Sequence, residues 1–148
     1  MKRTDRKGFT LLEVLVVVAI IGILAAVALP NLLNAIDRGK QKRTMADLRS
    51  IGTAVEFYSI DNDYYPYVAA MNSLAVYIEP VYIRTVPQDD GWLRTFQVAA
   101  TASEYTVCSG GKDGGNCTAD ANGASANFND SITFSNGRFV QFPAGPQE

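Results

Sequence analysis

The sequence predicts an α+β protein in which one long N-terminal helix packs against a small antiparallel β-sheet head. An apolar run over residues 9–29 follows a basic leader. It is long enough to cross a membrane as a helix, which takes about 20 residues. Apolar side chains then recur at spacings of three and four, as on one face of a helix. Beyond residue 95, short segments rich in β-branched and aromatic residues are typical of strands.

The first two segments of the chain are a basic leader, residues 1–8, and an apolar half-helix, residues 9–30, whose one charged side chain is Glu13. Basic residues favour the cytoplasmic side of a membrane, so we expect the leader inside and the rest of the chain outside. A carboxylate within the bilayer costs about 2.5–3.5 kcal/mol on insertion scales. A plain membrane anchor does not explain Glu13, and neither does a secretory signal cleaved at Ala26-Val27-Ala28.

The amphipathic half of the helix is expected over residues 31–62. It should end near Asp61-Asn62-Asp63, because the residue before Pro66 disfavours helical backbone. Its apolar face is formed by Met45, Leu48, Ile51, Val55 and Tyr58.

Five bases lie in the first part of this half, and we call them the basic collar: Arg38, Lys40, Lys42, Arg43 and Arg49. From Ile51 onward the chain has eleven acidic residues and four basic ones. Three interpretations of the basic collar remain open: a solvated helix face, contacts with the acidic head of a stacked neighbour, or contacts with DNA or anionic lipid. Contacts between subunits would weaken in added salt.

The head is expected over residues 63–148, with a short helix near residues 69–77. Strands are predicted at residues 95–99, 104–108, 132–135 and 138–142, and Asn136-Gly137 is typical of a two-residue hairpin turn. Cys108 and Cys117 are the only cysteines. Their even number, in a chain expected outside the cytoplasm, predicts a disulfide that closes a loop, with free thiols as the alternative.

The composition argues against an enzyme. The chain has no histidine, which is the commonest general base and metal ligand. It also has no P-loop, zinc-protease or dinucleotide-binding motif. The acidic head is not typical of nucleic-acid-binding domains, so no nucleic acid is expected as a partner, and no cofactor is required.

The segment Gly8-Phe9-Thr10-Leu11-Leu12-Glu13 resembles the processing signal of type IV pilins and related pseudopilins. This resemblance implies that a prepilin peptidase cleaves between Gly8 and Phe9 and that the new amino group of Phe9 is methylated. It also implies that the Glu13 carboxylate pairs with the amino-terminal ammonium of a neighbouring subunit in a helical filament. A buried charge is tolerated when it is paired, so such a partner would set the register of assembly.

Two further positions in the apolar half are candidate assembly residues. Gly22 and Ala26 form a pair of small residues that lets helices approach closely in a membrane, although chance in an alanine-rich segment is an alternative. Pro30, which matches a proline of the family pattern, lacks a backbone donor and should loosen the helix in the preceding turn.

Three stretches beyond residue 48 resemble the major pseudopilins of type II secretion systems: "RSIGTAVEFYSIDNDYYP", "VPQDDGW" and "YTVCSGGKDGG". Leu93 stands where that pattern has a glycine, and the two cysteines are not typical of it. The resemblance implies calcium in the C-terminal loop, with Asp113 and Asp130 at matching positions. Asp120 and Asn122 could add oxygens, since calcium takes six to eight. A metal-free loop held by the disulfide is the alternative.

The expected function is therefore that of a structural subunit of a helical, pilus-like filament, foremost the major pseudopilin of a type II secretion system. The implied partners are further copies of the chain, the prepilin peptidase, an inner-membrane assembly platform with its ATPase motor, and membrane lipid before assembly. We expect one pass through the inner membrane, a periplasmic head, and a filament in the periplasm or on the cell surface. The alternatives are a major type IVa pilus subunit, for adhesion, motility or DNA uptake, and a signal-cleaved periplasmic binding domain.

Overall fold

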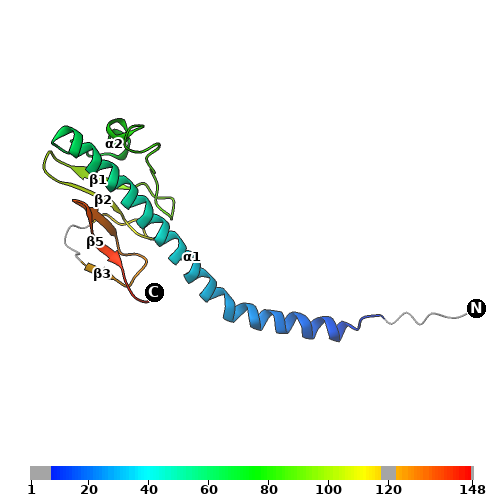
Figure 1. The fold of residues 1–148 in the computed structure, drawn as a ribbon. Helices are drawn as coiled ribbons and strands as arrows, with labels where there is room; N and C mark the ends of the chain where they lie inside the picture. Colours follow the sequence, from blue (N-terminus) through cyan, green and yellow to red (C-terminus); the bar gives the residue numbers. More distant parts are fainter. Residues whose placement is uncertain (1–7, 118–122, 148) are drawn as a thin grey trace, which may run out of the picture. The chain divides into compact units, whose positions relative to one another are not determined.

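The structure is a computed structural model that describes residues 8–117 and 123–147 (Figure 1). The basic leader up to residue 7, together with Asp120 and Asn122, lies outside these residues. The chain divides into two compact units, Met1–Ala35 and Ile36–Glu148. The long helix α1 (Leu11–Asn62) belongs to both units, and it ends where the sequence predicts.

The first unit contains the apolar part of α1. The described residues include one helix long and apolar enough to cross a membrane, judged by length and composition. Every residue from 8 to 36 is exposed, including large apolar side chains such as Phe9, which is 84% exposed. The helix continues through Pro30 without a break. The described residues of this unit, 8–35, are therefore largely helical and none of their apolar side chains is buried.

The second unit has a closed hydrophobic core beneath the amphipathic part of α1. Leu48 and Ile51 are fully buried and Val55 is nearly so, which confirms the predicted apolar face, with Met45 half-buried at its edge. Gly52 lies directly against the Phe134 ring, where a Cβ atom would collide with the ring. Its small size brings the helix close enough for the Tyr105 hydroxyl to donate to the Gly52 carbonyl at 3.2 Å.

A five-stranded sheet packs on this core (Figure 1). The strand order is β1-β2-β4-β5-β3. The strands are β1 (Gln97–Ala100), β2 (Tyr105–Ser109), β3 (Gly123–Ser125), β4 (Ile132–Ser135) and β5 (Arg138–Pro143). The β4–β5 turn is the predicted hairpin turn, since Asn136 and Gly137 have φ of 47° and 79°, both in the left-handed region.

The four predicted strands form antiparallel pairs, and β3 is a further strand that the sequence did not predict. β3 pairs parallel to β5, while the other three pairings are antiparallel. The sequence Gly-Ala-Ser of β3 lacks the β-branched and aromatic residues by which strands are recognised. The short helix α2 (Met71–Ile78) lies close to its predicted place and buries Met71, Leu74 and Ile78.

Candidate assembly site

The charged side chain of the apolar segment lies in the first turn of α1. The Thr10 hydroxyl accepts the Glu13 backbone N–H at 3.2 Å. The Glu13 carboxylate in turn accepts the Thr10 backbone N–H at 2.8 Å and its hydroxyl at 3.0 Å. This reciprocal pair is a capping box, which satisfies two donors that a helix start otherwise leaves unpaired. The capping role of Thr10 was not among the predictions from the sequence, although the Thr-x-x-Glu spacing signals it.

The capping box gives Glu13 hydrogen bonds but no opposite charge. Among the residues that the structure describes, the two ion pairs both lie beyond residue 36, so none involves Glu13. The positive end of the α1 dipole favours a carboxylate there by about 0.3–1 kcal/mol, which is less than the insertion cost of the charge. A cation from outside these residues is still needed for full neutralisation.

The other candidate residues of this segment are open to the surroundings. Gly8 and Phe9 precede the first turn of α1 and are exposed, so the bond between them is accessible. No atom lies within 4 Å of where a Cβ of Gly22 would be. The structure places Glu13, Gly22 and Pro30 along one helix and brings none of them together within the subunit.

At the start of the second unit, a buried carboxylate joins the head to α1. Asp37, 7% exposed, accepts the Trp92 indole N–H at 3.1 Å and the Lys112 ammonium at 2.8 Å. Burial alone would raise the pKa of Asp37, but the bonds from Lys112 and Trp92 and the charges of Lys112 and Lys40 outweigh it, so this pKa is lowered. The three residues come from distant parts of the sequence, which is why no local pattern predicted them.

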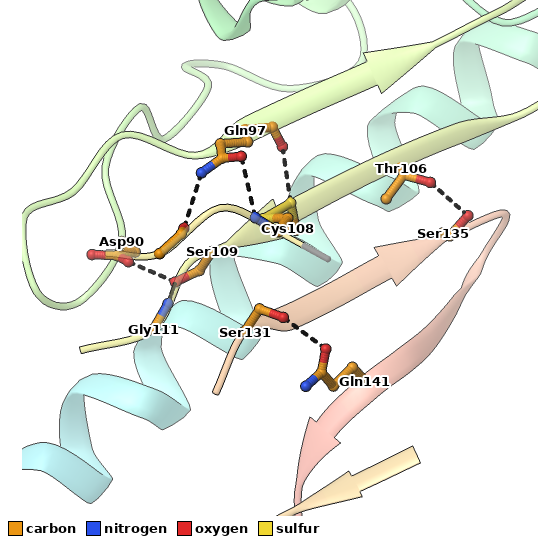
Figure 2. The surroundings of a disulfide bond; sticks show 11 residues. Asp90, Gln97, Thr106, Cys108, Ser109, Gly111, Ser131, Ser135 and Gln141 are labelled. Atoms are coloured by element: carbon orange, nitrogen blue, oxygen red, sulfur yellow. Dashed lines mark hydrogen bonds between the residues drawn. A yellow bond between two sulfur atoms is a disulfide. The ribbon is translucent and has the colours of Figure 1, made fainter. Parts of the chain in front are cut away.

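A second buried carboxylate shapes the turn that carries Trp92. Asp90 is 1% exposed and accepts the backbone N–H groups of Trp92 at 2.8 Å and Arg94 at 3.0 Å. Its other oxygen accepts the Ser109 hydroxyl, which joins the turn to β2 (Figure 2). Leu93, within this turn, has a φ of 63°, in the left-handed region that glycine adopts without strain.

The predicted disulfide is present between Cys108 and Cys117, whose Cα atoms are 6.3 Å apart. Figure 2 shows the surroundings of the bridge, where the side chain of Gln97 on β1 bonds the closed loop. Its amide nitrogen donates to the Gly115 carbonyl at 3.2 Å, and its oxygen accepts the Cys117 N–H at 3.4 Å. The bridge and Gln97 together hold the loop to the edge of the sheet.

The two tentative calcium ligands lie on turns that adjoin each other. Lys112 donates its backbone N–H to the Phe128 carbonyl at 2.8 Å, which joins the turn containing Asp113 to the turn before Asp130. One Asp113 oxygen already accepts the Gly115 N–H at 3.0 Å, and the Arg94 guanidinium bonds the Lys112 carbonyl. In the described part of the chain, no three metal-ligating side chains gather. These residues alone do not supply the six oxygens that calcium needs.

Comparison with known proteins decides the family. The model of the prokaryotic N-terminal methylation motif matches residues 3–29, and that of type II secretion system (T2SS), protein G matches residues 31–127. The chain belongs to the type II secretion system protein G family. The protein G family consists of major pseudopilins, which are structural filament subunits and not enzymes.

Relatives named type II secretion system core protein G match most of this chain and most of their own length. The protein from Klebsiella michiganensis is 32% identical over 127 residues, covering 77% of this chain and 89% of its own. That from Vibrio cholerae is 33% identical over 132 residues, covering 79% and 90%. That from Aeromonas hydrophila is 32% identical over 127 residues, covering 77% and 88%. No solved structure gave a significant match.

Membership of the protein G family, with the matched methylation motif, implies processing by a prepilin peptidase and assembly into a filament. The single N-terminal apolar helix is consistent with an inner-membrane anchor and a periplasmic head. The predicted structural, non-enzymatic function is therefore confirmed, and the family excludes the signal-cleaved binding domain.

Proposed function

We propose that cleavage between Gly8 and Phe9 converts this chain into the repeating subunit of a pseudopilus that remains in the periplasm. In this account residues 1–8 are the removed leader, and residues 9–30 span the membrane and later form the filament core. Residues 31–62 then form the amphipathic stem, and residues 63–148 the head. The apolar surface of the first unit carries this proposal, since the structure leaves all its described residues, 8–35, exposed.

The Glu13 carboxylate would be the recognition group of assembly. Cleavage would expose an ammonium at Phe9, which is then methylated in a separate step; it lies one residue from the Thr10 group that orients Glu13. The new ammonium of a neighbouring copy would supply the cation that Glu13 lacks among the described residues. Because an unpaired charge is costly in an apolar environment, only copies in the correct register would satisfy both groups. Gly22 would let neighbouring helices approach, and Pro30 would provide a weak point in the helix.

The specific partners follow from this function. The prepilin peptidase would act on Gly8 and Phe9, and an inner-membrane assembly platform with its ATPase motor would lift the subunit out of the lipid. A surface type IVa pilus would use the same residues. The identity to proteins named core protein G supports the secretion pseudopilus as the function of this chain.

We infer that the head needs no metal, because the disulfide, Gln97 and Arg94 already hold the loop near Asp113. A ligand at a hundredfold its dissociation constant would stabilise the head by about 2.7 kcal/mol. Titration of calcium against the thermal unfolding of the full chain should therefore give no shift. A shift that chelator reverses, and that Asp113→Ala abolishes, would contradict this inference.

The test of the proposed function is filament assembly by Glu13→Ala in cells that carry the matching secretion machinery. The variant should insert and be cleaved as the wild type is, but its filament yield should fall at least about tenfold, since the unpaired ammonium destabilises the interface. Leu15→Ala is the comparison, because it removes apolar packing surface of the same helix without removing a charge, and it should lower the filament yield much less than Glu13→Ala does. Normal filament yield from processed Glu13→Ala would contradict the proposed pairing of Glu13 with a neighbouring ammonium.

A further inference from the structure

The distal end of α1 carries negative charge at a place where helices favour positive charge. Asp61 lies in the last turn, Asp63 directly follows the helix, both are exposed, and the last turn holds no base. The helix dipole places a partial negative charge at this end, so the two carboxylates add to it. Tyr82 donates to Asp61 at 2.9 Å, but no ion pair involves either residue in the described part of the chain. We call Asp61 and Asp63 the acidic helix end.

The basic collar has the opposite imbalance within the same unit. Its one ion pair among the described residues joins Arg43 to Asp47 at 3.6 Å, so the other four members have no carboxylate within 4.0 Å. Arg38 and Lys42 are both exposed and lie four residues apart, on successive turns of α1. Like charges on neighbouring turns repel one another, so the basic collar as a whole favours an acidic partner.

Lys42 and Arg49 line a groove with a volume of about 720 Å³, which we call the collar groove. Small side chains of α1, among them Ala46 and Ser50, line it as well, and Phe139 and Tyr82 border it. The Arg49 guanidinium lies 5.4 Å from the centroid of the Phe139 ring. The collar groove therefore offers an apolar surface with cations beside it, which suits a partner with exposed apolar and acidic groups.

We propose that the acidic helix end of one copy docks in the collar groove of the next copy. This inference rests on the proposed function, because it assigns one contact of the filament. Ile60, 70% exposed beside Asp61, would meet the apolar lining while the two carboxylates face Lys42 and Arg49. The two surfaces meet at Tyr82, which borders the collar groove and donates to Asp61, but their charged residues differ. The contact is therefore heterologous and repeats from copy to copy instead of closing a pair.

Anionic lipid is a weaker explanation of the collar groove. Arg49 lies thirteen residues after Ile36, the last large apolar residue of the exposed segment, which is about 20 Å along a helix. The headgroup layer extends only about 5–8 Å beyond the hydrocarbon on each side. Lipid phosphates could reach the first bases of the basic collar but not Arg49, whereas the acidic helix end of another copy has no such limit.

A charge exchange in the full chain tests this docking. The collar variant is Lys42→Glu with Arg49→Glu. The helix-end variant is Asp61→Lys with Asp63→Asn, since asparagine tolerates the φ of 65° at Asp63. The control is Arg84→Glu with Arg138→Glu, two exposed bases outside the basic collar. Filament yield is measured with the matching secretion machinery, and thermal unfolding of the head and the amount of inserted chain are measured alongside.

Each of the two variants should lower filament yield by about tenfold or more, and the chain carrying all four changes should recover to within about threefold of wild type. The control should assemble normally. Docking is overturned if the fourfold variant, folded and inserted, assembles no better than its parents, or if the parents assemble like wild type. Loss of membrane retention in the collar variant, with normal filaments from the helix-end variant, would instead assign the basic collar to lipid. Absence of wild-type filaments would contradict the proposed function itself.

Discussion

The two units of this protein differ in whether they bury their apolar side chains. In the second unit, Leu48 is fully buried in the hydrophobic core, whereas Leu24 in the first unit is 64% exposed. Both lie on α1, so helix formation alone does not distinguish them. A hydrophobic side chain stabilises a fold only where it leaves water, by about 25 cal/mol per Å² buried. The head therefore stabilises itself, while the first unit depends on lipid or on other copies of the chain.

Carboxylates show the same contrast. Asp37 and Asp90 of the second unit are buried, and among the described residues their hydrogen bonds come from their own unit. Glu13 is bonded by Thr10 but lacks a cation among the described residues. The two buried carboxylates thus stabilise the fold of one subunit, whereas the Glu13 carboxylate is available to bind a neighbouring subunit.

The sharpest way to test this contrast is one substitution made in both units. Leu48→Ala should destabilise the head by about 3–4 kcal/mol, because it leaves a cavity in the core. Leu24→Ala should change the unfolding free energy by less than about 0.5 kcal/mol, as an exposed site does. Denaturant unfolding of the full chain in detergent, followed by fluorescence of the single tryptophan, Trp92, measures both. Equal effects would show that the first unit contributes to the stability of the head.

The disulfide should give the next largest effect. Cys108→Ser with Cys117→Ser should cost about 2–3 kcal/mol, as expected for a bridge that closes a short loop. The bridged residues are nine positions apart. Reductant should destabilise the wild type by a similar amount and leave the double variant unchanged. If reductant has no effect on wild-type unfolding, then Gln97 and the sheet hold the loop without the bridge.

The joint between α1 and the head should depend on pH. Asp37→Asn should cost about 1–2 kcal/mol at pH 7, because it removes the charge that Lys112 and Trp92 bind. The pKa of Asp37 is lowered in the fold, so its contribution is complete above its ordinary value of 3.8 and is lost as pH falls through the folded pKa. The difference between variant and wild type should shrink only below that pH. The exposed Asp113→Asn is the control, and a difference that persists undiminished in acid would contradict the role of the charge.

The smallest expected effect is a gain in stability. Leu93→Gly should stabilise the head by up to about 1 kcal/mol, because Leu93 has a left-handed φ of 63° and its side chain is 78% exposed. Leu93→Ala is the matched control and should give no comparable gain, since alanine keeps the Cβ that causes the strain. Destabilisation by Leu93→Gly would mean that the side chain has a packing role in the isolated subunit.

Much of the fold could be predicted because its signals are local. The apolar face around Ile51, the end of α1 and the turn at Asn136-Gly137 are each encoded within a few neighbouring residues. Thr10 belongs to the same class, since its capping partner is three residues away. Asp37 and Lys112 could not be paired from sequence because 75 residues separate them and both are common surface residues. Strand β3 is specified by its register with β5 and not by its own composition.

At Leu93 the structure explains why the family pattern has a glycine. The family pattern indicated that a glycine fits there, and the backbone of this chain shows the physical reason in the positive φ. The two candidate calcium ligands, Asp113 and Asp130, lie on adjoining turns. No third metal-ligating side chain joins them among the described residues. Calcium at Asp113 and Asp130 therefore stays a prediction, which the calcium titration tests.

The proposed assembly requires that other copies bind the first unit, and that they do so after cleavage between Gly8 and Phe9. The most direct measurement is the amino-terminal sequence and mass of the chain recovered from filaments made by its own secretion machinery. The account predicts chains that begin at methylated Phe9 and retain Glu13. Filaments built from chains that begin at Met1 or near Leu29, or a chain trimmed to Phe9 that never enters a filament, would contradict it.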